Sequence, residues 1–153
     1  ESRFAPEEAM SREAFAKFLA VTYGFSWSGR DPGFADVAPG SWYEPYVNAL
    51  YEAGIIHGTG DGAFGTGRSI TRQDMITMLF NALRKSGETL PAVRTYEGFG
   101  DEQQVADYAS PAVRALYEAG IINGMGNDLL VPGATATRAA MAVILLNALR
   151  SAR

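Results

Sequence analysis

Three arginines follow a serine or threonine at places where the sequence predicts that helices begin. They are Arg12 in "MSREAF", Arg72 in "SITRQDM" and Arg138 in "ATRAAM". Thr71 is expected to cap its helix, with Asp74 completing a capping box three residues later. A cation on the first turn opposes the helix dipole and costs up to about 1 kcal/mol at an exposed site. Because the placement recurs, we expect a specific interaction to offset this cost.

Two interactions would explain these arginines, and they are compatible. One is an internal ion pair, since Asp36 and Asp101 hold equivalent places in the sequence and each could meet an arginine. The other is an anion site, because a guanidinium beside free helix amides suits a carboxylate or a phosphate. Glycine-rich stretches beginning at Gly58 and Gly124 could be tight turns or a ligand cradle. Trp42, at an expected helix start, could stack on a sugar ring, whereas most other aromatic residues are expected in the core.

The sequence offers little for catalysis or metal binding. The single histidine, His57, has no nucleophile or orienting residue paired with it in the sequence. The glycine-rich stretches lack the Gly-Lys-Ser/Thr ending of a P-loop, and Asp61 lacks the alternating ligands of an EF-hand. A hydrolase that uses only carboxylates, such as Asp36 and Asp61, is a third hypothesis. We expect a protein that is not an enzyme, with no catalytic residue, no cofactor and no metal.

The composition of the chain limits the classes of partner and of binding site that it can have. The 153 residues include 13 basic and 17 acidic side chains, for a net charge of −4, and no cysteine. No disulfide or thiolate metal site can form, and an acidic balance weakens a nucleic-acid partner. No apolar run approaches the ~20 residues of a membrane span, so no membrane insertion is expected. If the protein is exported, its signal peptide lies outside this sequence.

Internal repetition organises the chain into units of about 60–66 residues. Three pairs of segments recur in the same order: "GFADV" and "GFGDE" at 33–37 and 98–102, "LYEAGIIHG" and "LYEAGIING" at 50–58 and 116–124, and "TRQDMITMLFNALR" and "TRAAMAVILLNALR" at 71–84 and 137–150. Each unit thus has a first half, with a Phe-x-Asp loop and a helix, and a second half that carries the Ser/Thr-Arg helix.

The N-terminal segment resembles a second half alone. "SREAFAKFLAVTYGF" at 11–25 aligns with the later Thr-Arg helices, and Phe4 aligns with Leu130. Either the chain starts inside a repeat, or something else supplies the missing half. The predicted division is the second half of repeat 1 at 1–30, repeat 2 at 31–90 and repeat 3 at 91–153, all packed as one compact domain.

Apolar spacing predicts an all-α fold of tandem helix–turn–helix units. Ser41 with Glu44, and Ser110 before a proline, are expected to cap the first-half helices. No segment alternates as a strand does, and a short helix is conceivable at 103–107. The expected helices are 12–23, 42–53, 72–85, 111–119 and 138–150.

The ordered motifs resemble the S-layer homology domain. Phe-x-Asp, a tryptophan, "AGIIHG", "DGAF" and "ITRQD" follow one another as in that family. Residues 34–84 match almost throughout, 99–150 match less closely, and 4–23 match the second half only. Each motif alone would be weak evidence, whereas their ordered combination is specific.

The resemblance implies a fold and a function. Such domains usually come in threes, pack with pseudo-threefold symmetry and anchor exported proteins to the bacterial cell wall or S-layer. Their typical ligand is a secondary cell-wall polysaccharide, often carrying a pyruvate ketal, which the Thr-Arg motif is implicated in holding. The carbohydrate-binding candidates are Arg72, Arg138, Arg12, Trp42, Asp36, Asp101, Thr71, Gly58 and Gly124.

The candidates are not equivalent. Arg72 ranks first because "ITRQD" is the most complete motif. Around Arg138, "ATRAA" has lost the leading isoleucine and the acidic residue, and Tyr108 stands where repeat 2 has Trp42. Arg12 belongs to half a repeat. An alternative function is a structural or assembly module that meets S-layer protein subunits through exposed helix faces.

Overall fold

A computed structural model describes residues 5–151, and within this range the fold is all-α, as the apolar spacing predicts. Phe4, which aligns with Leu130, lies outside the described residues. Between residues 5 and 151 the β-pairing is limited to isolated bridges, without a named strand. The helices are α1 (Arg12–Tyr23), α2 (Glu44–Glu52), α3 (Arg72–Lys85), the 3₁₀ helix η1 (Glu102–Gln104), α4 (Ser110–Glu118) and α5 (Arg138–Ser151).

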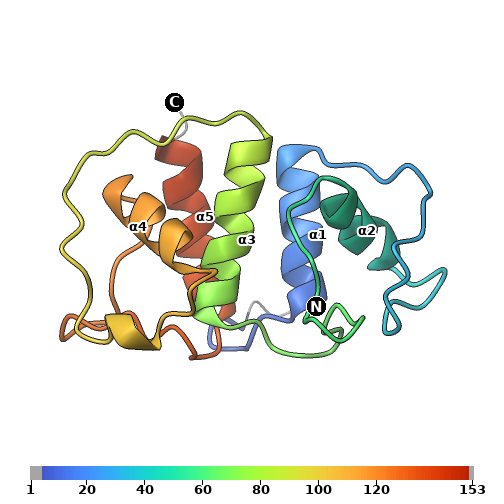
Figure 1. The fold of residues 1–153 in the computed structure, drawn as a ribbon, viewed down its shortest axis with the longest axis horizontal. Helices are drawn as coiled ribbons and strands as arrows, with labels where there is room; N and C mark the ends of the chain where they lie inside the picture. The colour runs from blue at the N-terminus through green and yellow to red at the C-terminus, as the bar shows by residue number, and fades with distance from the viewer. Residues whose placement is uncertain (1–4, 152–153) are drawn as a thin grey trace.

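The second-half helices α1, α3 and α5 run in similar directions through the molecule, and the first-half helices lie outside them (Figure 1). Helix α2 packs on α1, and α4 packs on α3. Each first-half helix therefore covers the second-half helix of the preceding unit. Long connectors around residues 24–43 and 86–101 run over the outside of the molecule (Figure 1).

The turns before the three second-half helices are joined by a closed ring of backbone hydrogen bonds. The amide of Met10 donates to the carbonyl of Ala136 at 2.9 Å, Ala136 donates to Ile70 at 2.9 Å, and Ile70 donates to Met10 at 2.8 Å. These residues hold equivalent places directly before the Ser/Thr-Arg pairs. The ring fixes the three helix starts next to one another, while pseudo-threefold symmetry of the whole units stays a prediction.

Helix α3 shows how the sequence pattern builds the core. Met75, Leu79 and Leu83 recur at four-residue spacing and are fully buried. Burying a leucine side chain contributes about 1.5–3 kcal/mol relative to exposure. The same face continues into one hydrophobic cluster that takes in residues from all five α-helices. Packing into this shared core holds α1, α3 and α5 together and so places the arginines at their starts near one another.

The predicted caps are confirmed on the second-half helices and wrong on the first-half helices. Side-chain oxygens of Ser11, Thr71 and Thr137 accept the amides of Ala14, Asp74 and Ala140. Ser41 and Ser110, in contrast, do not cap.

Helix α2 begins at Glu44 and α4 begins at Ser110 itself, each with a proline as its second residue and without a side-chain cap. Proline has no amide to be capped and presets the helical φ angle, so these starts are fixed by proline geometry. The Glu44 carboxylate instead accepts the amide of Gly40 at 2.6 Å. The short helix expected at 103–107 is a 3₁₀ turn at Glu102–Gln104.

Candidate functional site

The first arginine, Arg12, is held by the turn of the next repeat. Its amide donates to the carbonyl of Arg68 at 3.0 Å, and its Nε donates to the carbonyl of Phe64 at 2.9 Å. Its Nη1 forms an ion pair of 2.7 Å with Oδ2 of Asp74 in α3. The guanidinium also lies over the Phe64 ring, with 5.1 Å between Cζ and the ring centroid. An arginine on the first turn is thus used to join two repeats.

Arg72 repeats the backbone contacts of Arg12 in the next unit. Its amide donates to the carbonyl of Ala134 at 2.8 Å, and its Nε donates to the carbonyl of Leu130 at 2.9 Å. The residue is only 5% exposed. Burial lowers the pKa of the Arg72 guanidinium below its usual value. Between residues 5 and 151 no carboxylate forms an ion pair with it.

Arg138 is anchored by its backbone in the same way, since its amide donates to the carbonyl of Glu8 at 2.9 Å. Its Nη1 lies 3.9 Å from Oε2 of Glu8, and the exposed fractions of the two side chains are 41% for Arg138 and 67% for Glu8. All three arginines therefore share one arrangement of the main chain. The backbone amide of each arginine, expected to be free at the helix start, donates instead to a carbonyl of a neighbouring repeat.

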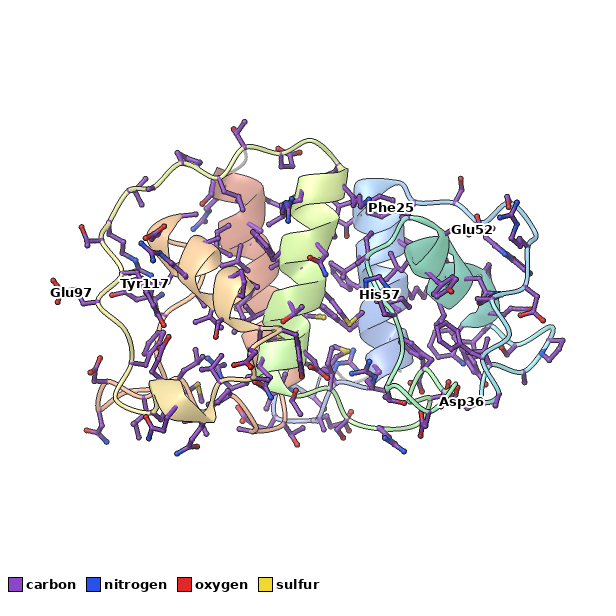
Figure 2. All side chains as sticks on the ribbon, viewed as in Figure 1. Phe25, Asp36, Glu52, His57, Glu97 and Tyr117 are labelled. Carbon is purple, nitrogen blue, oxygen red and sulfur yellow. The ribbon has the colours of Figure 1, made fainter. Side chains whose placement is uncertain are left out.

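The expectation that Asp36 and Asp101 meet arginines is wrong. Asp36 accepts three backbone amides, from Phe64, Gly65 and Thr66, at 2.7, 2.8 and 2.7 Å. Burial raises the pKa of Asp36, but the amide hydrogen bonds outweigh it, so the pKa lies below its usual value. Figure 2 shows Asp36 at the lower edge of the molecule, among the loops.

Asp101 plays the same part in repeat 3. It accepts the amides of Leu130 and Val131 at 2.9 and 2.8 Å. Burial again raises the pKa of Asp101, but the amide hydrogen bonds lower it by more, so the pKa lies below its usual value. The carbonyl of Leu130 is the one that receives Nε of Arg72. Each aspartate therefore shapes the turn that holds an arginine side chain, and acts on the arginine only through that turn.

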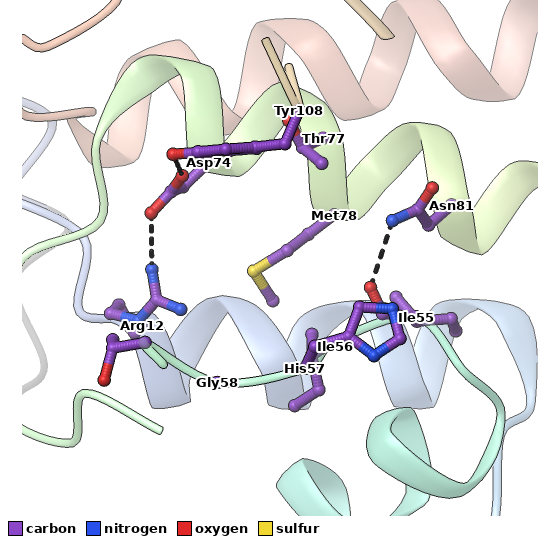
Figure 3. A pocket seen from close by; sticks show the side chains of 11 residues that line it. Arg12, Ile55, Ile56, His57, Gly58, Asp74, Thr77, Met78, Asn81 and Tyr108 are labelled. Atoms are coloured by element: carbon purple, nitrogen blue, oxygen red, sulfur yellow. Dashed lines mark hydrogen bonds and ion pairs between the residues drawn. The ribbon is translucent and has the colours of Figure 1, made fainter. Parts of the chain in front are cut away.

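A pocket of about 580 Å³ opens between α1, α3 and the loop that follows α2 (Figure 3). Arg12 and Asp74 lie at one end, and Asn81 lies at the other, where it donates to the carbonyl of Ile55 at 3.1 Å. His57 and other polar and apolar side chains complete the lining. The lining residues are Arg12, Ile55, Ile56, His57, Gly58, Thr59, Asp74, Thr77, Met78, Asn81 and Tyr108.

Asp74 joins two sides of this pocket. One of its oxygens pairs with Arg12, and the other accepts the hydroxyl of Tyr108 at 2.5 Å (Figure 3). Burial and the hydrogen bond to the Asp74 carboxylate raise the pKa of Tyr108 to about 12. Asp74 therefore does not close the capping box with its side chain, because that side chain reaches other units of the fold.

Of the remaining carbohydrate-binding candidates, some line the pocket and others lie elsewhere. Gly58 lines the pocket, and a Cβ there would lie 2.6 Å from the carbonyl oxygen of Ala63, so its turn requires glycine. Gly124 approaches Leu129 similarly, with 2.9 Å from such a Cβ to the carbonyl oxygen. Thr71 serves as the helix cap.

Trp42 lies outside the pocket. It is 54% exposed, and the Nζ of Lys17 lies 5.7 Å from its ring centroid. The aromatic residue that does line the pocket is Tyr108, which holds the equivalent place in repeat 3. The sequence shows this equivalence, but Tyr108 is not among the carbohydrate-binding residues predicted from it.

Asp74, Asn81 and His57 were also missed as pocket residues. The repeat could have indicated Asn81, which is preserved as Asn147, but Asp74 and His57 are replaced by Ala140 and Asn123 in repeat 3. Within the part of the chain that the structure describes, no group of three acidic or histidine residues is arranged to hold a metal ion. Nor is any helix in that part long and apolar enough to cross a membrane.

The chain is similar to one known domain family and to several larger proteins. The S-layer homology domain matches the chain twice, at residues 33–76 and 98–142. The S-layer protein sap of Bacillus anthracis is 31% identical over 116 residues, which are 75% of this chain and 13% of that protein.

Two relatives with enzyme names match over more of the chain. An amylopullulanase of Thermoanaerobacterium thermosulfurigenes is 28% identical over 145 residues, which are 95% of this chain and 8% of the enzyme. An uncharacterized cell wall amidase of Bacillus anthracis is 31% identical over 137 residues, which are 89% of this chain and 25% of that protein. The chain thus spans a quarter or less of the length of these relatives.

Proposed function

Because the chain belongs to the S-layer homology domain family, we propose that it is a non-catalytic module that binds an acidic polysaccharide of the cell wall. Domains of this family anchor cell-surface proteins to the cell wall. The finer claim is that arginines at helix starts meet an acidic group, such as a pyruvate ketal. On this proposal the protein acts outside the cell, at the wall or S-layer.

The observation that carries the proposal is the way in which Arg12 and Arg72 are held. In each, Nε donates to a backbone carbonyl, which fixes the guanidinium plane, and the residue is at least nine-tenths buried. A planar fork that is already oriented loses little freedom when it pairs with a carboxylate. A charge held in a poorly solvated place also interacts more strongly with an anion than an exposed one does.

The pocket beside Arg12 supplies what a sugar needs. Its volume of about 580 Å³ falls within the range of small-molecule sites. Hydroxyl, amide and imidazole groups from Thr77, Asn81 and His57 line it together with the apolar Met78. Such a mixture can hydrogen-bond to sugar hydroxyls and pack against the apolar face of a ring.

The test is sedimentation with purified cell walls. Arg72→Ala should weaken co-sedimentation while the helical circular dichroism is retained, and Arg72→Lys should weaken it too, because lysine lacks the fork. Arg84→Ala removes the same charge from the exposed end of α3 and is the matched control. Unchanged binding by both Arg72 variants would rule the proposal out.

A second candidate function is a module that meets protein partners, and one observation favours it. Leu149 in α5 is 51% exposed, whereas its counterpart Leu83 in α3 is fully buried. Val143 and Leu146 add to this exposed apolar face. Retained binding to cell walls stripped of pyruvate would favour this function, and lost binding would favour the anion-dependent one.

A further inference from the structure

Each first-half segment touches two second-half helices, one through its helix and the other through the loop that follows. Helix α2 packs on α1, and its loop reaches α3, where Asn81 donates to the carbonyl of Ile55 at 3.1 Å. Helix α4 packs on α3, and its loop reaches α5, where Asn147 donates to the carbonyl of Ile121 at 3.1 Å. A first-half segment therefore bridges two neighbouring second-half helices.

Helix α5 lacks a covering helix. Among residues 5–151 no first-half helix packs on it as α2 packs on α1. When the second-half helices are aligned on their first arginines, Ala142 of α5 corresponds to Ala16 and Ile76, which are fully buried. Ala142 is exposed. Leu146 is 48% exposed, although its counterpart in α1, Ala20, is buried. The face that is covered on α1 and α3 is therefore apolar and open to solvent on α5.

Helix α1 is open where a loop would lie. Phe18 is 43% exposed, whereas its counterparts Met78 and Ile144 are buried. Met78 lies in the pocket that the loop after α2 also lines. Val21 is exposed too, and it holds the place of the two asparagines that donate to the loops on α3 and α5. Because valine has no donor, a loop on α1 would be held by apolar contact.

We propose that the open faces of α5 and α1 form one interaction surface, whose occupant is a first-half segment joined to the chain ahead of residue 1. One such segment covers both faces at once, with its helix on α5 and its loop over Phe18 and Val21. Contiguous exposed apolar surface of this kind marks an interaction site.

The register of the chain favours an occupant on the same chain. In repeat 2 the loop that reaches α3 lies only a few residues before Phe64, and Phe4 holds the place of Phe64 in the sequence. A segment joined ahead of residue 1 thus brings its loop next to α1 without a long connection. This inference is independent of the proposed function, because it concerns what completes the module and not which ligand the module binds.

The test supplies the segment. A copy of residues 33–60 joined ahead of residue 1 keeps the spacing of repeat 2, and thermal melts compare this extended chain with the 153-residue chain. Burial of the two apolar faces should raise the melting temperature by at least about 5 °C. The matched control is the same extension with Leu50→Asp in the copy, since Leu50 is fully buried in α2 and its charged replacement should prevent docking.

A second variant places the added segment on the surface. Leu146→Asp in α5 should cancel the increase in the extended chain, yet change the melting temperature of the 153-residue chain by much less, because Leu146 is half exposed there. An increase that survives Leu146→Asp would overturn the proposal. If the extended chain melts no higher than its control, the segment does not cover the surface and a separate protein is left as its occupant. Analytical ultracentrifugation of the 153-residue chain tests the remaining occupant, since a dimer that Leu146→Asp dissociates would assign the surface to a second copy and refute the proposal.

Discussion

Replacing Asp36 by asparagine tests whether a carboxylate shapes the turn that holds Arg12. Asp36 accepts three amides from consecutive residues at 2.7–2.8 Å, one on Oδ1 and two on Oδ2. Asparagine has one acceptor oxygen, so its NH₂ group must face at least one amide that also donates. The neighbouring carbonyl of Phe64 holds Nε of Arg12, so the damage should extend to the arginine.

The expected cost follows from this count. One hydrogen bond to a charged group is lost outright, which costs about 1.5–3 kcal/mol. A value of about 2 kcal/mol should lower the melting temperature by about 4–8 °C for a domain of this size. Asp107→Asn is the matched control, because Asp107 is exposed and no described residue donates a hydrogen bond to it. Thermal melts followed by circular dichroism measure both variants.

The pH dependence checks the same explanation. The pKa of Asp36 is lower in the folded chain than its usual value, because the amide bonds outweigh the effect of burial. Its contribution to stability is therefore present above the unfolded pKa of about 3.9 and lost as the pH falls through the folded value. The difference between wild type and Asp36→Asn should shrink over that range. A melting difference no larger than that of Asp107→Asn at pH 7 would refute the reasoning.

Two further pairs of variants test the packing. Gly65 and Gly126 have φ of 97° and 99°, so alanine strains either turn, but only at Gly65 would the new Cβ meet Arg12, with 2.8 Å to Nε. Gly65→Ala should therefore lower the unfolding free energy by more than the ~1–2 kcal/mol expected of Gly126→Ala, and equal losses in urea melts would contradict the contact. Leu83→Ala should cost about 2–5 kcal/mol, whereas Leu149→Ala at the equivalent exposed place should change stability by about 0.5 kcal/mol or less. The same urea melts measure both, and comparable losses would mean that the α5 face is covered.

The helices were predictable because their signals are local. Apolar residues at helical spacing and a Ser/Thr cap lie within one segment, and α3 and α1 have the predicted bounds. The first-half helices begin later or earlier than expected, since the serines predicted as caps, Ser41 and Ser110, do not cap them. The ring through Met10, Ile70 and Ala136 could not be read from any one segment, because its three bonds join different repeats.

The candidate site was less predictable, since its contacts span long stretches of sequence. Arg12 and Asp74 are 62 residues apart, and Asp74 and Tyr108 are 34 apart. Nothing in the sequence around Asp36 distinguishes a partner arginine from three backbone amides. The arginines themselves were found because repetition made a locally unfavourable residue recur at one position.

The most direct measurement of the central claim is a crystal structure of the chain soaked with a disaccharide that carries a pyruvate ketal. The account predicts that the ketal carboxylate lies within hydrogen-bonding distance of the terminal nitrogens of Arg72, at the start of α3. A carboxylate that contacts no arginine at a helix start would contradict it.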